Sequence, residues 1–221
     1  MSQEIWTAVD EHFVDQLVLH DEALMAALRS SEEAGLPAIN VAPNQGKLLQ
    51  MLAKLNGAKR ILEIGTLGGY SSIWMARALP AGGKMVTLEF EPLHAKVARA
   101  NIERAGLASV VEVRVGAALD LLPLLFEEHQ EPFDLVFIDA DKLNNPHYFQ
   151  WALKLTKSGS LILIDNVVRG GAVMDADSED PNVLGVRKVL EMIGKESRVT
   201  GTAIQTVGSK GYDGLALVLV N

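Results

Sequence analysis

The 221-residue chain contains no cysteine, which excludes disulfide bonds, thiolate metal ligands and a cysteine nucleophile. It also has no apolar run as long as a membrane-spanning helix, and no basic N-terminus leading into an apolar signal core. Basic residues are few: 20 Lys and Arg stand against 28 Asp and Glu, a net charge of −8 that disfavours binding by phosphate neutralisation. We expect a cytoplasmic protein that binds no membrane and has nucleic acid as an unlikely partner.

The composition, 48% hydrophobic and 22% charged, is that of a globular protein long enough for a substantial core. No repeat, low-complexity tract or long linker divides the chain, so we expect a single domain over residues 1–221. Ile5, Val9, Phe13 and Leu17 recur at helical spacing, which makes residues 1–56 an N-terminal helical segment. Residues 57–221 then form an α/β core.

Strand and helix patterns alternate in this core. Strands are expected at residues 60–64, 84–89, 110–115, 133–139, 160–165, 199–204 and 215–220, with helices between them, such as 71–79, 94–105 and 182–193. The alternation predicts a doubly wound, seven-stranded and mostly parallel sheet with helices on both faces. Ligands bind beyond the carboxyl ends of the strands in such sheets, so the residues that follow each strand are the candidates for chemistry.

The first of these segments is EIGTLGGYS, residues 63–71. Its three glycines allow a tight turn close to a ligand, although their spacing is not G-x-G-x-x-G and a purely structural turn is the alternative. Glu63 favours a ligand with an ammonium or sulfonium charge, because a carboxylate would repel a pyrophosphate. Glu89 lies 24 positions after Gly65, close to the ~20-residue offset of an acid that binds ribose hydroxyls. S-adenosylmethionine fits these features better than NAD.

With these residues in view, the sequence resembles the cation-dependent O-methyltransferases, a family that includes catechol O-methyltransferase and the plant caffeoyl-CoA O-methyltransferases. The resemblance runs from about Pro37 to the C-terminus through EIGTLGGYS, TLEFEP, VGAALDLLP, FIDADK, LILIDNVVRGG and GYDGLALV. It implies the Rossmann-like class I methyltransferase fold, S-adenosylmethionine as cofactor and one divalent cation. It also implies methylation of one hydroxyl of a vicinal diol, usually on a small aromatic substrate.

The metal ligands of the family fall on Asp139, Asp165 and Asn166. Two carboxylates and an amide oxygen are hard ligands, and they leave room for waters or a bidentate diol in an octahedral shell. Magnesium is therefore expected, with manganese and calcium as alternatives, and zinc is disfavoured because this ligand set includes no histidine or thiolate. The alternative for Asp165-Asn166 is an ordinary turn after a strand.

Further family positions carry over one at a time. Val41 resembles a backbone contact near the methionine carboxylate, and Ala118 resembles the adenine-proximal position that is Ser in the catechol enzyme. Arg169-Gly170-Gly171 departs from the bulkier Trp and Asn of the plant enzymes, so acyl-CoA recognition is not implied. The predicted cofactor-binding residues are Val41, Glu63, Gly65, Thr66, Ser71, Glu89, Ala118, Asp139 and Asp141.

Lys142 directly follows Asp139-Ala140-Asp141, and we predict that it is the general base. A free lysine and a free phenol both hold their protons at neutral pH, so the reaction needs charges that favour proton loss. A cation at the diol and the sulfonium of the cofactor supply such charges. An exposed loop lysine is the ordinary alternative for a single residue of this kind.

Three functions stay open at this point. The first is a small-molecule diol O-methyltransferase, and the second is methylation of a hydroxylated nucleobase in RNA by the same metal-assisted chemistry. The third, a cofactor-sensing module without catalysis, is disfavoured by the intact set of Asp139, Lys142, Asp165 and Asn166. The apolar N-terminal residues, among them Trp6 and Phe13, also predict a homodimer.

Overall fold

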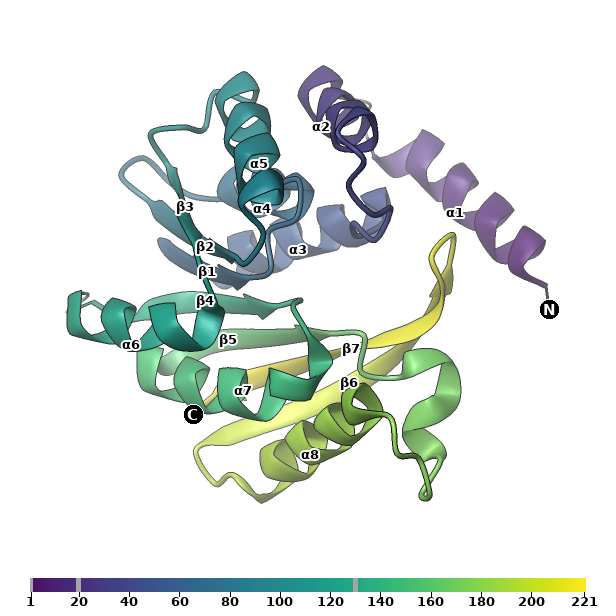
Figure 1. Ribbon diagram of the computed structural model, residues 1–221, viewed down its shortest axis with the longest axis vertical. Coiled ribbons are helices and arrows are strands. Elements are labelled where there is room, and N and C mark those ends of the chain that lie inside the picture. Colours follow the sequence, from purple (N-terminus) through teal and green to yellow (C-terminus); the bar gives the residue numbers. More distant parts are fainter. Residues whose placement is uncertain (1, 19–20, 129–130) are drawn as a thin grey trace.

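The computed structural model describes residues 2–18, 21–128 and 131–221 and has one seven-stranded sheet (Figure 1). Its strand order is β3-β2-β1-β4-β5-β7-β6, and β7 runs antiparallel to the other six strands. The strands are β1 (Arg60–Ile64), β2 (Lys84–Glu89), β3 (Val111–Val115), β4 (Phe133–Ile138), β5 (Thr156–Asp165), β6 (Val199–Gly208) and β7 (Gly211–Val220). The predicted doubly wound, mostly parallel sheet is confirmed.

Helices cover both faces of the sheet, because alternate strand residues face opposite sides. Ile61 packs with the layer of α2 (Glu22–Glu33), α3 (Pro43–Leu55), α4 (Tyr70–Ala76) and α5 (Pro92–Arg104). Leu62 packs with the layer of α6 (Ala118–Glu128), α7 (Asn145–Leu155) and α8 (Pro181–Lys195). No helix among the described residues is long and apolar enough to cross a membrane.

The last two strands are longer than the sequence predicts. They extend inward from the expected 199–204 and 215–220 to form a hairpin that closes at the Gly208–Gly211 pair. Gly211, Asp213 and Gly214 are typical of a loop, but the antiparallel pairing of β7 with β6 supplies backbone partners that local propensity does not include. The hairpin brings Asp213 to the carboxyl edge of the parallel strands, where Leu215, two positions further along β7, pairs with Asp165.

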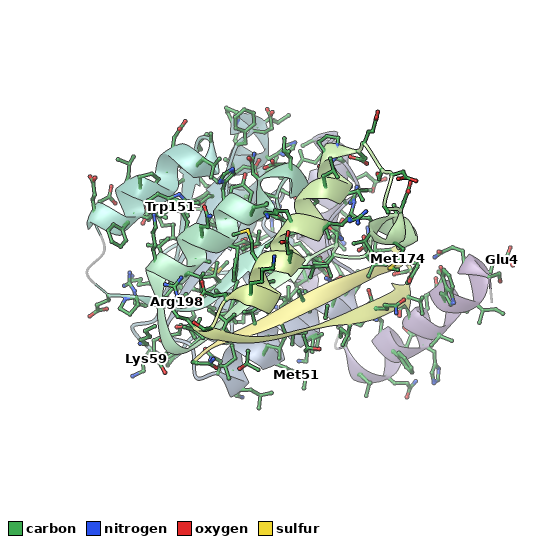
Figure 2. The ribbon with its side chains drawn as sticks, turned by 90° about the horizontal axis from the view of Figure 1, so that it is seen from below. Glu4, Met51, Lys59, Trp151, Met174 and Arg198 are labelled. Atoms are coloured by element: carbon green, nitrogen blue, oxygen red, sulfur yellow. The ribbon has the colours of Figure 1, made fainter. Side chains whose placement is uncertain are left out.

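Helix α1 (Gln3–Leu17) extends away from the sheet (Figure 2). Polar contacts hold it to the rest of the chain. The buried Asp10 carboxylate accepts hydrogen bonds from Asn44 Nδ2 at 2.8 Å and from the Ser209 backbone N–H at 2.7 Å. Gln3 Nε2 donates to the Gly208 carbonyl at 2.9 Å. The apolar stripe is left exposed, and its members Ile5, Val9, Phe13 and Leu17 are each 45–70% accessible.

A short 3-10 helix, η1 (Lys142–Asn144), follows β4 and rests on α8. The contact depends on Gly185 in α8, because a Cβ built there would lie 2.1 Å from the Lys142 carbonyl oxygen. No side chain larger than hydrogen fits at that distance. Helix α8 therefore fixes the backbone position of Lys142.

We expect Gly185→Ala to lower the free energy of unfolding by about 1–3 kcal/mol, since the methyl group must push η1 off α8. Gly194→Ala is the matched control: it lies in the same helix, with nothing within 4 Å of the added Cβ. This control should be neutral or stabilise the protein by up to about 1 kcal/mol through helix propensity. Urea unfolding of the two variants measures the difference, and equal stabilities would contradict the close contact.

Candidate active site

A cavity of about 780 Å³ opens at the carboxyl ends of the parallel strands. The segments after β1, β2, β3 and β4 and the loop after β5 all contribute to its wall. The predicted residues among its lining are Val41, Gly65, Thr66, Ser71, Glu89, Ala118, Asp139, Asp141, Lys142 and Asn166. The structure thus brings ten of the sequence-predicted residues around one cavity, with Asp165 buried at its edge and Glu63 inside the core.

The glycine-rich loop after β1 is held by Glu89 at the end of β2. Glu89 Oε2 accepts hydrogen bonds from the backbone N–H groups of Thr66 at 3.1 Å and Leu67 at 2.7 Å. Its Oε1 accepts from the Glu91 N–H at 2.9 Å and lies 3.4 Å from His94 Nδ1. Glu89 therefore shapes the loop as well as presenting a carboxylate to the cavity.

Glu63 does not reach the cavity, whereas the sequence predicts that it binds the cofactor. It is fully buried and does not line the cavity, because in the alternation of β1 it faces the α3–α5 layer. Its carboxylate accepts hydrogen bonds from Ser71 Oγ at 2.6 Å, Thr87 Oγ1 at 2.7 Å and Ser72 Oγ. Burial raises the pKa of Glu63 to about 7, and the three hydroxyl donors oppose this shift. Glu63 acts on the cavity through Ser71.

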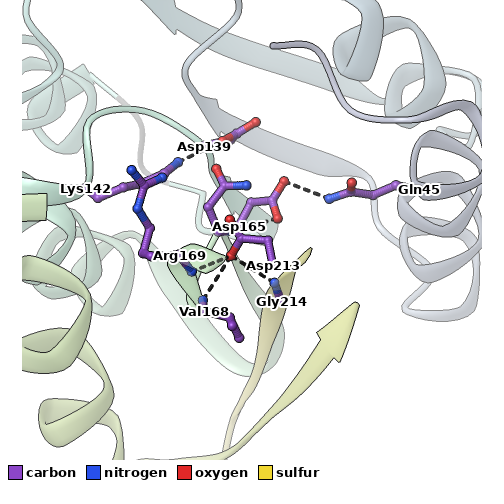
Figure 3. A network of polar contacts seen from close by, with 9 residues as sticks. Gln45, Asp139, Lys142, Asp165, Val168, Arg169, Asp213 and Gly214 are labelled. Atoms are coloured by element: carbon purple, nitrogen blue, oxygen red, sulfur yellow. Dashed lines mark hydrogen bonds and ion pairs between the residues drawn. The ribbon is translucent and has the colours of Figure 1, made fainter. Parts of the chain in front are cut away.

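The ends of β4 and β5 bring Asp139, Lys142 and Asp165 together (Figure 3). Lys142 is buried, and its Nζ donates to Asp139 Oδ1 at 2.8 Å. Asp165 Oδ2 accepts from Gln45 Nε2 at 2.7 Å. Burial, and next the charge of Asp139, raise the pKa of Asp165 well above its ordinary value, while Lys142 opposes the rise.

Asn166 follows Asp165 in the left-handed region, with φ 58°, a conformation that Asn tolerates better than most residues. Its backbone N–H donates to Asp165 Oδ1 at 2.8 Å, and the residue lines the cavity. Strained backbone of this kind concentrates at functional sites. The ordinary turn after a strand, which is the alternative interpretation of this pair, is thus also part of the cavity wall.

Asp141 is fixed by one side chain at the end of η1 and one in α7. It accepts hydrogen bonds from Asn144 Nδ2 at 2.6 Å and from the Tyr148 hydroxyl at 2.5 Å. Burial, and next the bond to Asp141, raise the pKa of Tyr148 above its ordinary value. Tyr148 also lines the cavity, although its sequence context favours a packing or surface role.

The residues present fit a divalent cation. Asp139 and Asp165 lie close enough for one charge to shift the pKa of the other, and Lys142 is the cation that offsets them. A divalent ion would stabilise this pair, with the Asn166 amide as a third oxygen ligand. Among the described residues no group of three or more His, Cys, Asp or Glu side chains is arranged for a metal, so the amide is essential to the set.

Three contacts at the cavity are not predicted from the sequence. Gln45 bonds Asp165 from 120 positions away, and His94 lies beside Glu89. Asp213 accepts hydrogen bonds from the backbone N–H groups of Val168 at 2.9 Å and Arg169 at 3.0 Å, and so holds the loop after β5 (Figure 3). Of the three, Asp213 carries a sequence signal, because it is the acid within the recognised GYDG motif.

The sheet order, the glycine loop after β1 and the acid ending β2 define a class I methyltransferase fold with its cavity at the strand ends. The comparisons with known proteins lead to the family: the O-methyltransferase family model matches residues 15–220. The chain therefore belongs to the O-methyltransferase family, whose members are S-adenosylmethionine-dependent enzymes, and the recognition of that family from the motifs is confirmed.

Similar proteins include a catechol O-methyltransferase of Niastella koreensis, which is 54% identical over all of both chains. An O-methyltransferase of Bacillus cereus, solved in complex with SAH, is 55% identical, with a TM-score of 0.98 and full coverage of both chains. The O-methyltransferase TomG of Streptomyces achromogenes, involved in tomaymycin synthesis and solved with SAM, is 53% identical, with a TM-score of 0.97. The match covers 100% of this chain and 99% of the TomG chain.

Glu63 predicts a particular dependence of stability on pH. Its folded-state pKa of about 7 lies above the ordinary value of 4.5, so the bound proton stabilises the fold fully below pH 4.5. This contribution, on the order of 3 kcal/mol, is lost as the pH rises through about 7. Glu63→Gln, which cannot ionise, should therefore lose less stability than wild type between pH 5 and pH 8.

Urea unfolding at several pH values measures this difference. Glu127→Gln, at an exposed position of α6, is the control and should follow the wild-type curve. Parallel curves for wild type and Glu63→Gln would mean that Glu63 does not hold a proton in the folded protein.

Proposed function

We propose that the protein transfers the methyl group of S-adenosylmethionine to one hydroxyl of a catechol-like vicinal diol on a small aromatic molecule, with one divalent cation. The observation that carries this proposal is the single cavity shared by the glycine loop, Glu89, Asp139, Lys142 and Asn166. The names of the similar proteins support it, since one is a catechol O-methyltransferase and another is solved with SAM.

The cofactor belongs on the β1–β3 side of the cavity. Glu89 would accept hydrogen bonds from the ribose hydroxyls, with lone pairs left by the three backbone N–H groups it already binds. Gly65, Thr66 and Ser71 would hold the methionine portion, near Val41 and Asp141, and Ala118 would lie by the adenine. Ala118 has no hydroxyl, so the adenine contact there is apolar.

The cation belongs between β4 and β5, held by Asp139, Asp165 and Asn166. A bound magnesium ion would orient the diol and favour loss of a hydroxyl proton. Gln45, in α3, orients Asp165, and the N–H of Asn166 donates to the other oxygen of the same carboxylate. These second contacts fix the direction of the Asp165 ligand.

In the reaction, the Lys142 amine, once it has released its own proton, accepts the hydroxyl proton of the substrate. The oxygen then forms a bond to the methyl carbon while the bond from that carbon to sulfur breaks, and the sulfur keeps the electron pair. The products are a methyl ether and S-adenosylhomocysteine. The protein contributes orientation above all, because Lys142 is buried and its backbone is seated on Gly185.

A homodimer is part of this proposal, with the exposed stripe of α1 as the contact. The helix is tied to its own chain by Gln3 and Asp10, which leaves Ile5, Val9, Phe13 and Leu17 uncovered. An apolar helix face of this kind can meet itself across a two-fold axis. A second copy of the chain is therefore its proposed occupant.

The test of the function is a pair of acceptors. With labelled S-adenosylmethionine and magnesium, catechol should be methylated and resorcinol, whose hydroxyls are not vicinal, should not. Excess EDTA or Asp165→Asn should lower the rate by about 100-fold or more, the effect of losing several kcal/mol of metal stabilisation. Asp120→Asn, an exposed acid in α6, is the charge-matched control.

Binding of manganese, followed by electron paramagnetic resonance, gives a second readout that does not depend on turnover. Asp165→Asn should weaken it and Asp120→Asn should not. Full turnover of catechol in EDTA would exclude the cation from the reaction.

Lys142 can be separated from its acidic neighbours by two substitutions. Lys142→Met keeps the apolar stem and removes the amine, and it should lower the single-turnover rate by roughly 10²–10⁴-fold. Lys142→Arg keeps the charge but cannot release a proton in the working range, so it should be as slow. Cofactor affinity by calorimetry should stay near wild type in both. A Lys142→Arg enzyme with wild-type rates would refute the base.

The dimer is tested by sedimentation at micromolar concentration. The double variant Phe13→Glu, Leu17→Glu should sediment as a monomer, because it buries like charges opposite each other in the symmetric contact. Leu124→Glu places the same change at an exposed site of α6 and should leave the dimer intact. A monomeric wild type would contradict the proposal.

A further inference from the structure

We propose that Arg169 forms an anion subsite in the acceptor half of the cavity, and that the enzyme prefers aromatic diols bearing a carboxylate. This inference rests on the proposed diol methylation and narrows its substrate class. Arg169 is the first residue of η2 (Arg169–Met174), the 3-10 segment that follows the cation ligands.

The charge of Arg169 has no counterpart in the structure. Its Nε is buried without a hydrogen-bond partner, and no carboxylate of the described residues forms an ion pair with its guanidinium. The three acids of the cavity lining that belong to the proposed site have donors already: Glu89 has backbone N–H groups, Asp139 has Lys142, and Asp141 has Asn144 and Tyr148. A buried donor without a partner is costly, so an incoming acceptor at this point gains affinity.

The backbone of Arg169 is strained and held in place. Its φ of 57° lies in the left-handed region, which costs a residue with a side chain roughly 1–2 kcal/mol. The Asp213 carboxylate stabilises this turn by accepting the N–H groups of Val168, Arg169 and Gly214 at 2.9–3.0 Å. The bonds to Asp213 fix the direction of the Arg169 side chain, which extends from the loop toward Lys142 in Figure 3.

Strand order places Arg169 with the acceptor and away from the cofactor. The proposed cofactor contacts follow β1, β2 and β3, whereas Arg169 follows β5, beyond β4 in the sheet. Neighbouring strands are about 4.8 Å apart, so the start of the loop after β5 lies about 10 Å from the glycine loop after β1. The proposed cation ligand Asp139 follows β4, between the two, and Asn166 starts the loop after β5, so a diol bound there would present its ring substituents to Arg169.

A carboxylate is the anion that matches. A guanidinium offers two parallel N–H donors, which fit the two oxygens of a carboxylate. The single charge of one arginine also matches a carboxylate better than a doubly charged phosphate. Asn182, at the start of α8, lines the same wall and adds an amide.

The experiment compares two acids with their primary amides. The acceptors are 3,4-dihydroxybenzoate and 3-(3,4-dihydroxyphenyl)propanoate, which differ in the reach of the carboxylate, and the amide of each. For wild type with magnesium, kcat/KM of at least one acid should exceed that of its amide by tenfold or more. In Arg169→Gln this ratio should fall at least tenfold.

A charge reversal and a control sharpen the test. Arg169→Glu should prefer the cationic diol 3,4-dihydroxyphenethylamine over both acids. Lys188→Gln removes one positive charge from the exposed face of α8, outside the cavity, and should keep the wild-type ratio. Binding of each acid by calorimetry, with S-adenosylhomocysteine present, should show the same order as the kinetics.

The outcomes separate the two proposals. If wild type methylates none of catechol, the acids and the amides, diol methylation itself fails and the subsite with it. If it methylates catechol but neither the acids nor the amides, only the anion subsite is refuted. If wild type methylates acids and amides equally well, or if Arg169→Gln lowers kcat/KM for both by the same factor, the diol chemistry stands and the anion subsite is refuted.

Discussion

The site depends on one close approach between backbones. Gly65 lies so near the end of β4 that a Cβ on it would be 2.2 Å from the Asp139 carbonyl oxygen, and the Asp139 N–H in turn donates to the Ile64 carbonyl at 2.8 Å. This contact joins the loop proposed for the cofactor to the strand proposed for the cation. A methyl donor and its acceptor must meet within a few ångströms for in-line transfer, and adjacent parallel strands supply that distance.

Around this contact the protein concentrates acids and neutralises them by different means. Glu63 has only hydroxyl donors and a raised pKa, whereas Glu89 is surrounded by backbone N–H groups. Asp139 has an ion pair with Lys142, and Asp165 has an amide and a raised pKa. Burial is the largest cause of both raised pKa values; for Asp165 the charge of Asp139 adds to the shift and Lys142 opposes it. A cation bound between Asp139 and Asp165 would favour the ionised form of both.

Much of this arrangement could be predicted from the sequence, because its signals are local. Buried apolar runs ending in acids located β1, β2 and β4 to within a residue, and the ligands at their ends follow from the parallel topology. The direction of Glu63 could not be predicted, since it depends on which face of β1 meets which layer. Gln45, 120 positions before its partner Asp165, and the full length of the β6–β7 hairpin also depend on tertiary pairing. The hydrogen bond from Tyr148 to Asp141, seven positions earlier, could not be predicted either, because it depends on the direction in which α7 begins.

Asp213 holds the loop after β5 by backbone N–H groups alone. Such an anchor does not involve the side chain of Arg169, so that side chain can change while these hydrogen bonds remain, whereas the buried Val168 is constrained by packing. A substitution of the Arg169 side chain therefore leaves the contacts that hold the loop after β5 in place. In evolutionary terms the motif allows the loop to diverge: one lineage can exchange its acceptor while the proposed cation ligands, at the ends of β4 and β5, keep their geometry.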